Sequence, residues 1–136
     1  LRPLARAALR QRDGANNYAY FLSLEGRDLE RALAMAGRAI VLEENNPTYL
    51  DTYAWVLYRL GRYDEAKKTM QQALSLDRSQ SPDLQLHYGD ILAALGEKFM
   101  AEVYWKKALE GGYDDPDAIV ERFRRLKEAA QTPAAP

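Results

Sequence analysis

The chain contains no cysteine and a single histidine, His87. Without cysteine there is no disulfide, no thiolate metal site and no cysteine nucleophile. One histidine cannot build a histidine-rich metal site, and it has no thiol to activate. The serines lie in no recognisable nucleophile motif, and no glycine-rich phosphate loop follows a predicted strand. We therefore expect no enzyme, no cofactor and no metal site.

Long apolar runs and a large excess of one charge are also missing. No apolar stretch approaches the roughly 18 residues that a membrane-spanning helix needs, and no signal peptide is visible. The 19 Lys and Arg residues and 20 Asp and Glu residues give a formal net charge of −1. General nucleic-acid binders carry a basic excess instead. We therefore expect neither nucleic-acid binding nor direct membrane insertion.

Basic residues are concentrated at the two ends of the chain. Residues 1–12 hold four arginines and no acid, and residues 118–128 hold four basic residues against two acids. This leaves 11 basic and 18 acidic residues in the middle, 13–117, a balance of −7. Basic ends around an acidic body favour an acidic partner or a second copy. Solvated helix faces explain the same pattern equally well.

An internal repeat organises the sequence. Tyr18, Tyr53 and Tyr88 are each 35 residues apart. The same spacing relates three further sets: Ala19, Ala54 and Gly89; Leu22, Leu57 and Leu92; and Gly26, Gly61 and Gly96. A period near 34 residues is the signature of stacked supersecondary units that share a continuous core.

Each copy reads as a helix, a turn and a second helix. In the middle copy, Leu50, Tyr53, Ala54 and Leu57 form one helical stripe, and Ala66, Met70, Ala73 and Leu74 form another. Pro47 and Pro82 suit the first turn of a helix, where the missing N–H has no partner to lose. Gly61 suits a left-handed helix end. Small Ala54 and Ala66 predict a close crossing between paired helices.

The stretch "YAWVLYRLGRYDEAKKTMQQALSLD" resembles the tetratricopeptide repeat family in the order of its small, glycine and alanine positions. The resemblance implies an all-α, right-handed solenoid of three repeats, at 13–46, 47–81 and 82–115. We expect residues 1–12 to form a basic helix, the end of a preceding repeat. "DDPDAIVERFRRLKEAA" predicts a capping helix at 116–130 with Asp115 as N-cap, and 131–136 predict a disordered tail.

In this family the first helices line a concave groove that binds partners. At 100° per residue, a second face of these helices lies beside the core stripe. It carries the predicted partner-binding residues Asn16, Tyr20, Asp51, Trp55, Tyr58, Arg59, Leu86 and Asp90. The inner positions are mostly aromatic or acidic, so we expect no clamp for a terminal carboxylate. Trp55 has two interpretations, exposure in the groove or packing against a neighbouring repeat.

The resemblance implies a non-catalytic scaffold or adaptor that binds a protein partner as a peptide or helix in this groove. The alternative is a self-assembly module whose ends stack into a homodimer or a longer array. "NNYAYFL" and "NPTYLDTYAWVLYRLGRYDEA" resemble C-terminal repeats of long bacterial tetratricopeptide proteins, many of them envelope-associated. We therefore expect one module of a longer protein that is periplasmic or envelope-associated, with a cytoplasmic location as the alternative.

Overall fold

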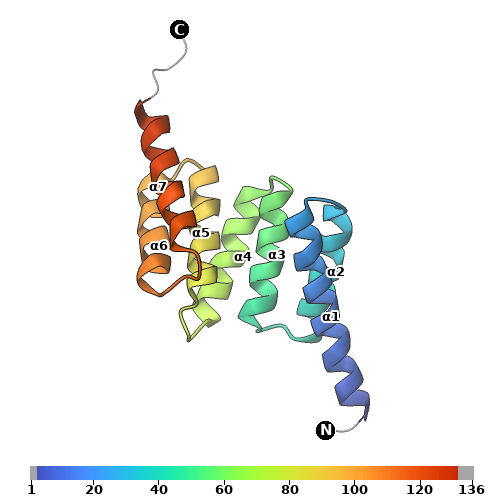
Figure 1. The fold of residues 1–136 in the computed structure, drawn as a ribbon. Helices are drawn as coiled ribbons and strands as arrows, with labels where there is room; N and C mark the ends of the chain where they lie inside the picture. Colours follow the sequence, from blue (N-terminus) through green and yellow to red (C-terminus); the bar gives the residue numbers. More distant parts are fainter. Residues whose placement is uncertain (1–2, 132–136) are drawn as a thin grey trace. The chain divides into compact units, whose positions relative to one another are not determined.

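The computed structural model describes the backbone of residues 3–131 and the side chains of residues 13–131. Across residues 3–131 all regular secondary structure is helical (Figure 1). The helices are α1 (Pro3–Glu25), α2 (Leu29–Leu42), α3 (Pro47–Arg59), α4 (Tyr63–Leu76), α5 (Pro82–Ala94), α6 (Lys98–Glu110) and α7 (Pro116–Gln131). The predicted all-α helical repeat fold is confirmed.

Helix starts follow the local chemistry of the sequence. Pro47 and Pro82 are the first residues of α3 and α5, as predicted. Ahead of Pro47, the Asn46 side-chain oxygen accepts the backbone N–H groups of Thr48 and Tyr49, at 2.9 and 3.2 Å. Such a cap satisfies amides that the first helical turn leaves without partners. Asp115 accepts the N–H of Ala118 at 3.2 Å and caps α7.

The turn at Gly61 ends α3 as predicted. Gly61 has a φ of 81°, in the left-handed region that an L side chain adopts only with strain. The next residue, Arg62, donates its N–H back to the Leu57 carbonyl at 2.9 Å. This bond satisfies a carbonyl at the helix end and directs the chain into α4.

The N-terminal segment differs from the prediction. We expected residues 1–12 to be a separate helix, yet α1 runs unbroken from Pro3 to Glu25. A second helix of a preceding repeat would need a turn before the next first helix, and residues 3–12 instead extend α1. Gly14 lies inside α1 and does not break it, because a glycine costs a helix only about 1 kcal/mol. The tail expected at 131–136 falls outside the described residues, apart from Gln131, the last residue of α7.

The chain divides after Ser79 into two compact units. In the first unit, α1 pairs with α2 and α3 pairs with α4, while α3 also packs against α1 and α2. Its α1–α2–α3 core consists of the fully buried residues Ala19, Leu22, Ala32, Ala36 and Val56. Leu33, Met35, Tyr53 and Leu60 pack around this core. Ala54 and Ala66 are both fully buried, as expected for small residues at a helix crossing.

In the second unit α5 pairs with α6, and α7 packs on α6. The buried residues of this unit include Leu84, Leu86, Tyr88, Ile91, Leu92, Ala101, Trp105, Ala108 and Ile119. The Phe123 ring of α7 meets the Trp105 ring edge-to-face, with centroids 5.7 Å apart. The face of α7 that carries Ile119 and Phe123 therefore covers α6, the arrangement we predicted for a capping helix.

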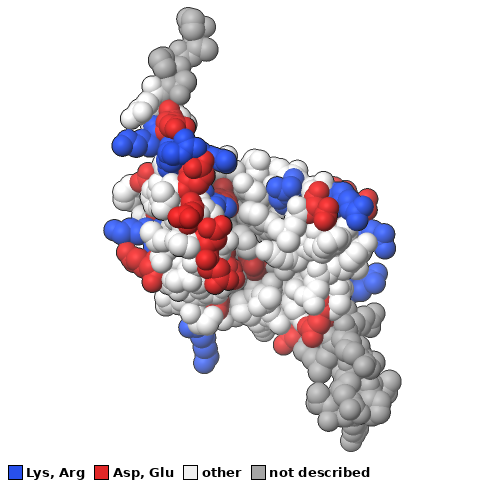
Figure 2. All heavy atoms as spheres, viewed as in Figure 1, with Lys and Arg blue, Asp and Glu red and all other residues white. Residues whose placement is uncertain are grey.

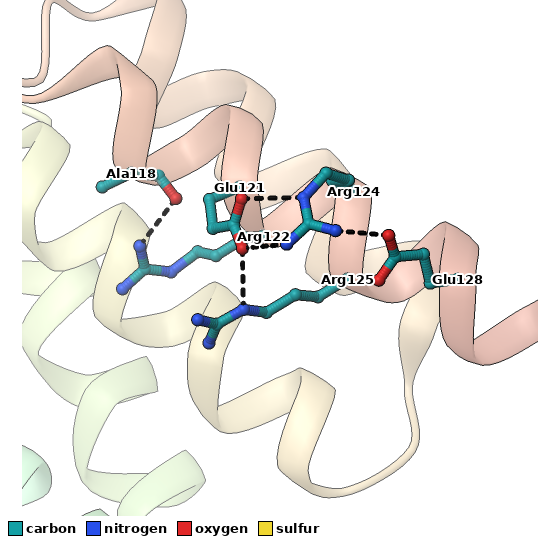
Figure 3. Close-up of polar contacts among 6 residues, drawn as sticks. All are labelled: Ala118, Glu121, Arg122, Arg124, Arg125 and Glu128. Carbon is teal, nitrogen blue, oxygen red and sulfur yellow. Dashed lines mark hydrogen bonds and ion pairs between the residues drawn. The ribbon is translucent and has the colours of Figure 1, made fainter.

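The outer face of α7 is charged (Figure 2). Arg124 pairs with Glu121 and Glu128, and Arg125 Nε lies 3.1 Å from Glu121 (Figure 3). The hydrogen bond from Arg124, with a second one from Arg125, lowers the pKa of Glu121 to about 2. These pairs are exposed, so they keep this face of α7 solvated and add little stability.

Candidate partner-binding surface

Six of the eight predicted binding residues belong to the first unit and two to the second. Asn16 and Tyr20 lie on α1. Asp51, Trp55, Tyr58 and Arg59 lie on α3, which packs against α1. Leu86 and Asp90 lie on α5 of the second unit.

An aromatic cluster forms at the C-terminal half of α3. Trp55 and Tyr58 stack one helical turn apart, with ring centroids 4.7 Å apart and planes 16° from parallel. Tyr63, the first residue of α4, lies against Tyr58 at 5.6 Å. All three side chains are half-buried, so Trp55 is neither a core residue nor fully exposed. Sequence analysis missed Tyr63, although its place two residues after Gly61 puts it beside the end of α3.

Arg59, four residues after Trp55 on α3, reaches toward the end of α1. Its side chain is exposed, and its guanidinium lies over the end of α1, where a Cβ built on Gly26 would be 2.9 Å from Nη2. Tyr20 of α1 is half-buried. We call Tyr20, Trp55, Tyr58 and Arg59 the aromatic face.

Asn16 and Asp51 were expected at the edge of the groove, but both are buried, at 6% and 9% exposure. Asn16 Oδ1 accepts no hydrogen bond from any residue that the structure describes. A buried acceptor without a donor costs about 1–3 kcal/mol. The two polar groups therefore lie beneath the surface of the first unit, and Asn16 carries an energetic cost there.

The substitution Asn16→Leu is expected to stabilise the first unit by about 1 kcal/mol, because it removes the unsatisfied amide oxygen and keeps the number and branching of the side-chain heavy atoms. Leu86, at the same position of the third repeat, is buried at 2% exposure. Urea denaturation of the variant measures the gain. The neighbouring exposed Asn17→Leu is the control and should change stability by less than about 0.5 kcal/mol. A loss of stability in Asn16→Leu would mean that the amide has a partner in solution.

The two predicted residues of the second unit serve its own packing. Leu86 is a core residue. Asp90 is 8% exposed and accepts three hydrogen bonds: from Arg122 Nε at 2.7 Å, Arg122 Nη2 at 2.9 Å and Trp105 Nε1 at 2.9 Å. The carboxylate thus joins α5 to α6 and α7 within the unit.

Arg122 of α7 reaches the buried Asp90 of α5. Its side chain is 29% exposed and pairs with Asp90. It also donates to the Ala118 carbonyl at 3.0 Å, as Figure 3 shows. Helical periodicity places Arg122 outside the apolar stripe, but a long arginine reaches a buried acid from the border of that stripe. We call Gly89, Asp90, Trp105 and Arg122 the Asp90 cluster.

The described residues contain neither a group of metal-binding side chains nor a helix suited to span a membrane. Over the part of the chain that the structure describes, no three His, Asp or Glu side chains are grouped so that they could hold a metal ion. None of the helices α1 to α7 combines the length and the apolar character that a membrane span requires.

Comparison with known proteins shows which proteins share this fold. Residues 47–79 match the family model of the tetratricopeptide repeat, and no curated protein matches the chain. The type III secretion translocator chaperone SycD of Yersinia enterocolitica is 17% identical, with 90% of this chain and 96% of that chain covered and a TM-score of 0.73. The Sgt2 TPR domain from Aspergillus fumigatus is 19% identical over 92% of this chain and 84% of its own, also with a TM-score of 0.73.

A third solved structure contains a bound peptide. It is the first TPR of Spaghetti (RPAP3) bound to the HSP90 peptide SRMEEVD, 18% identical, with 92% of this chain and 94% of that chain covered and a TM-score of 0.73. At such identities the likeness concerns the fold and does not extend to the ligand.

Proposed function

Because this chain is a tetratricopeptide repeat protein, we propose that it is a non-catalytic interaction scaffold that binds a peptide segment of a protein partner on the aromatic face. The stacked, half-buried pair of Trp55 and Tyr58 carries the proposal. Tryptophan, tyrosine and arginine are the residues that most often dominate binding energy at interfaces. The peptide bound to the Spaghetti TPR domain is a precedent for this use of the fold.

The chemistry of the aromatic face favours a particular kind of peptide. Stacked rings offer a flat apolar surface for an aromatic or aliphatic side chain. The exposed Arg59, four residues after Trp55 on α3, presents donors that match a carboxylate. The preferred peptide therefore carries an apolar anchor followed by an acidic residue.

The substitutions Trp55→Ala and Tyr58→Ala are expected to weaken peptide binding at least tenfold, about 1.4 kcal/mol, with helical circular dichroism unchanged. Candidate peptides come from a random peptide library selected on the intact chain and are then synthesised. Fluorescence anisotropy measures their affinity. The control is Phe99→Ala, which removes another exposed aromatic ring, on α6 of the second unit.

Two tryptophan indoles make the location of binding visible. In a ¹H–¹⁵N spectrum, peptide binding at the aromatic face shifts the indole signal of Trp55 and leaves that of buried Trp105 in place. The assignment fails if selected peptides bind the alanine variants with unchanged affinity, or if only the Trp105 signal moves. If both alanine variants unfold, Trp55 belongs to the core and the aromatic face is not a binding site.

A further inference from the structure

One stripe of α1 carries two exposed aromatic rings, Tyr18 and Phe21, with Arg31 of α2 over the Tyr18 ring at 5.7 Å from its centroid. Tyr18 and Phe21 are 38% and 46% exposed, and their rings stack with centroids 6.3 Å apart. Gly14 and Asn17, also exposed, lie on the same side of the helix, since residues three and four apart share a face. We call Gly14, Asn17, Tyr18 and Phe21 the open stripe. It lies apart from the aromatic face, which uses Tyr20 of α1.

The corresponding stripe of α3 is covered. Thirty-five residues further along, Tyr49, Thr52 and Val56 are buried and Tyr53 is half-buried. On α5 the equivalents Leu84, Tyr88 and Ile91 are buried as well. The open stripe is therefore the exposed one of three equivalent surfaces.

In the α3 stripe, Tyr53 and Val56 are covered by α2, whereas the Tyr49 hydroxyl donates to Asp13 of α1. Val56 belongs to one buried cluster with Ala32 and Ala36 of α2. A Cβ built on Gly37 would lie 3.5 Å from the Tyr53 ring, so this ring rests on the α2 backbone. Small α2 residues thus let large α3 side chains approach closely. Among the described residues no helix precedes α1 to cover the open stripe in the same way.

We propose that the open stripe is a docking surface for an amphipathic helix of a partner protein, lying on α1 as α2 lies on α3. The docking helix would pack on α1 in the way that α2 packs on α3. The contacts between α2 and α3 therefore indicate which residues the docking helix presents. Tyr18 is identical to its equivalent Tyr53, and Phe21 is larger than Val56. The docking helix therefore presents alanine or glycine where α2 presents Ala32, Ala36 and Gly37.

The charge at one end of the open stripe adds a requirement for the docking helix. Leu60 packs on the core at the end of the α3 stripe, whereas its equivalent on α1 is Glu25, which is exposed. A carboxylate at that end favours a lysine or arginine on the docking helix. This surface and its partner are independent of the proposed peptide-binding function of the aromatic face.

The chain supplies its own probe, a synthetic peptide with the sequence of residues 29–44, which comprises α2. Added to the intact ¹⁵N-labelled chain, the peptide is expected to shift the backbone amide signals of the open stripe. The dissociation constant should be micromolar to millimolar, because a helix this short is largely unfolded alone and must be ordered on binding. Phe21→Asp should weaken binding at least tenfold, and Phe99→Asp, at a more exposed phenylalanine of the second unit, should leave it unchanged.

Three results would overturn the proposal. The first is the absence of shifts at millimolar peptide. The second is equal binding to the Phe21→Asp variant, which would mean that the peptide displaces α2 rather than docking on α1. The third is a dimer in light scattering that Phe21→Asp dissociates, which would assign the open stripe to a second copy. If Phe21→Asp does not fold, Phe21→Ala is used in its place, with a several-fold loss of affinity expected.

Discussion

Asp90→Ala is expected to destabilise the second unit by about 3 kcal/mol. The substitution removes the carboxylate that pairs with Arg122 and the acceptor of the buried Trp105 N–H. Removing one member of a buried ion pair typically costs 3–5 kcal/mol, because the other charge stays behind unpaired. The partial exposure of Arg122 places the expected loss at the lower end of that range. We therefore expect the largest effect of any single charge removal in the described part of the chain.

Urea denaturation in a Trp55→Phe background measures this loss, since Trp105 is then the sole tryptophan. Asp90→Asn keeps an acceptor for the indole and removes the charge, so it should fall between the wild type and alanine. Glu102→Ala, an exposed acid on α6, is the control and should change stability by less than about 0.5 kcal/mol. Equal effects of Asp90→Ala and Glu102→Ala would show that the Asp90 cluster contributes nothing to stability.

Gly89→Ala is expected to destabilise the second unit by about 2 kcal/mol, although alanine is the better helix former. Helix propensity alone would stabilise the variant by about 1 kcal/mol. A Cβ on Gly89, however, would lie 2.4 Å from Trp105 Cδ1 and 2.6 Å from Trp105 Nε1, well inside van der Waals contact. The indole would have to move and would lose its bond to Asp90, so overpacking outweighs propensity.

A second substitution tests the steric cause. In the second repeat the positions of Gly89 and Trp105 are occupied by Ala54 and Met70, both fully buried. Trp105→Met is therefore expected to be less harmful in the Gly89→Ala background than in the wild type. Gly14→Ala is the control, because its Cβ would meet nothing within 4 Å, and it should raise stability by up to about 1 kcal/mol. Additive effects of Gly89→Ala and Trp105→Met would rule out a clash between these positions.

Local chemistry made much of the fold predictable. Pro47, Pro82 and Gly61 act through their own backbone constraints, so they mark helix ends whatever surrounds them. The buried stripes followed from periodicity, since a helix with one covered face repeats its apolar residues every three or four positions.

The candidate site was less predictable, because it depends on what lies opposite each helix. Asp90 lies at the same angle around α5 as Trp55 does around α3. Its partner Arg122, however, comes from α7 and lies 32 residues further along the chain. Nothing in the spacing of α5 indicates that partner. Asn16 and Asp51 likewise sit at angles typical of a groove edge and turn out to be buried. Arg122 itself had a signal, since a long cation beside an apolar stripe often reaches a buried acid.

Matched side-chain volumes make each helix pair specific to its own repeat. The three pairs of positions hold Ala19 with Ala36, Ala54 with Met70, and Gly89 with Trp105, and all six residues are buried. Replacing α4 by α6 would bring a tryptophan against Ala54, whose methyl group occupies the space that Gly89 leaves open. Gene recombination within the turn of a repeat would therefore produce poorly packed hybrids. Duplication or exchange of whole helix pairs would keep each large residue with the small residue that accommodates it.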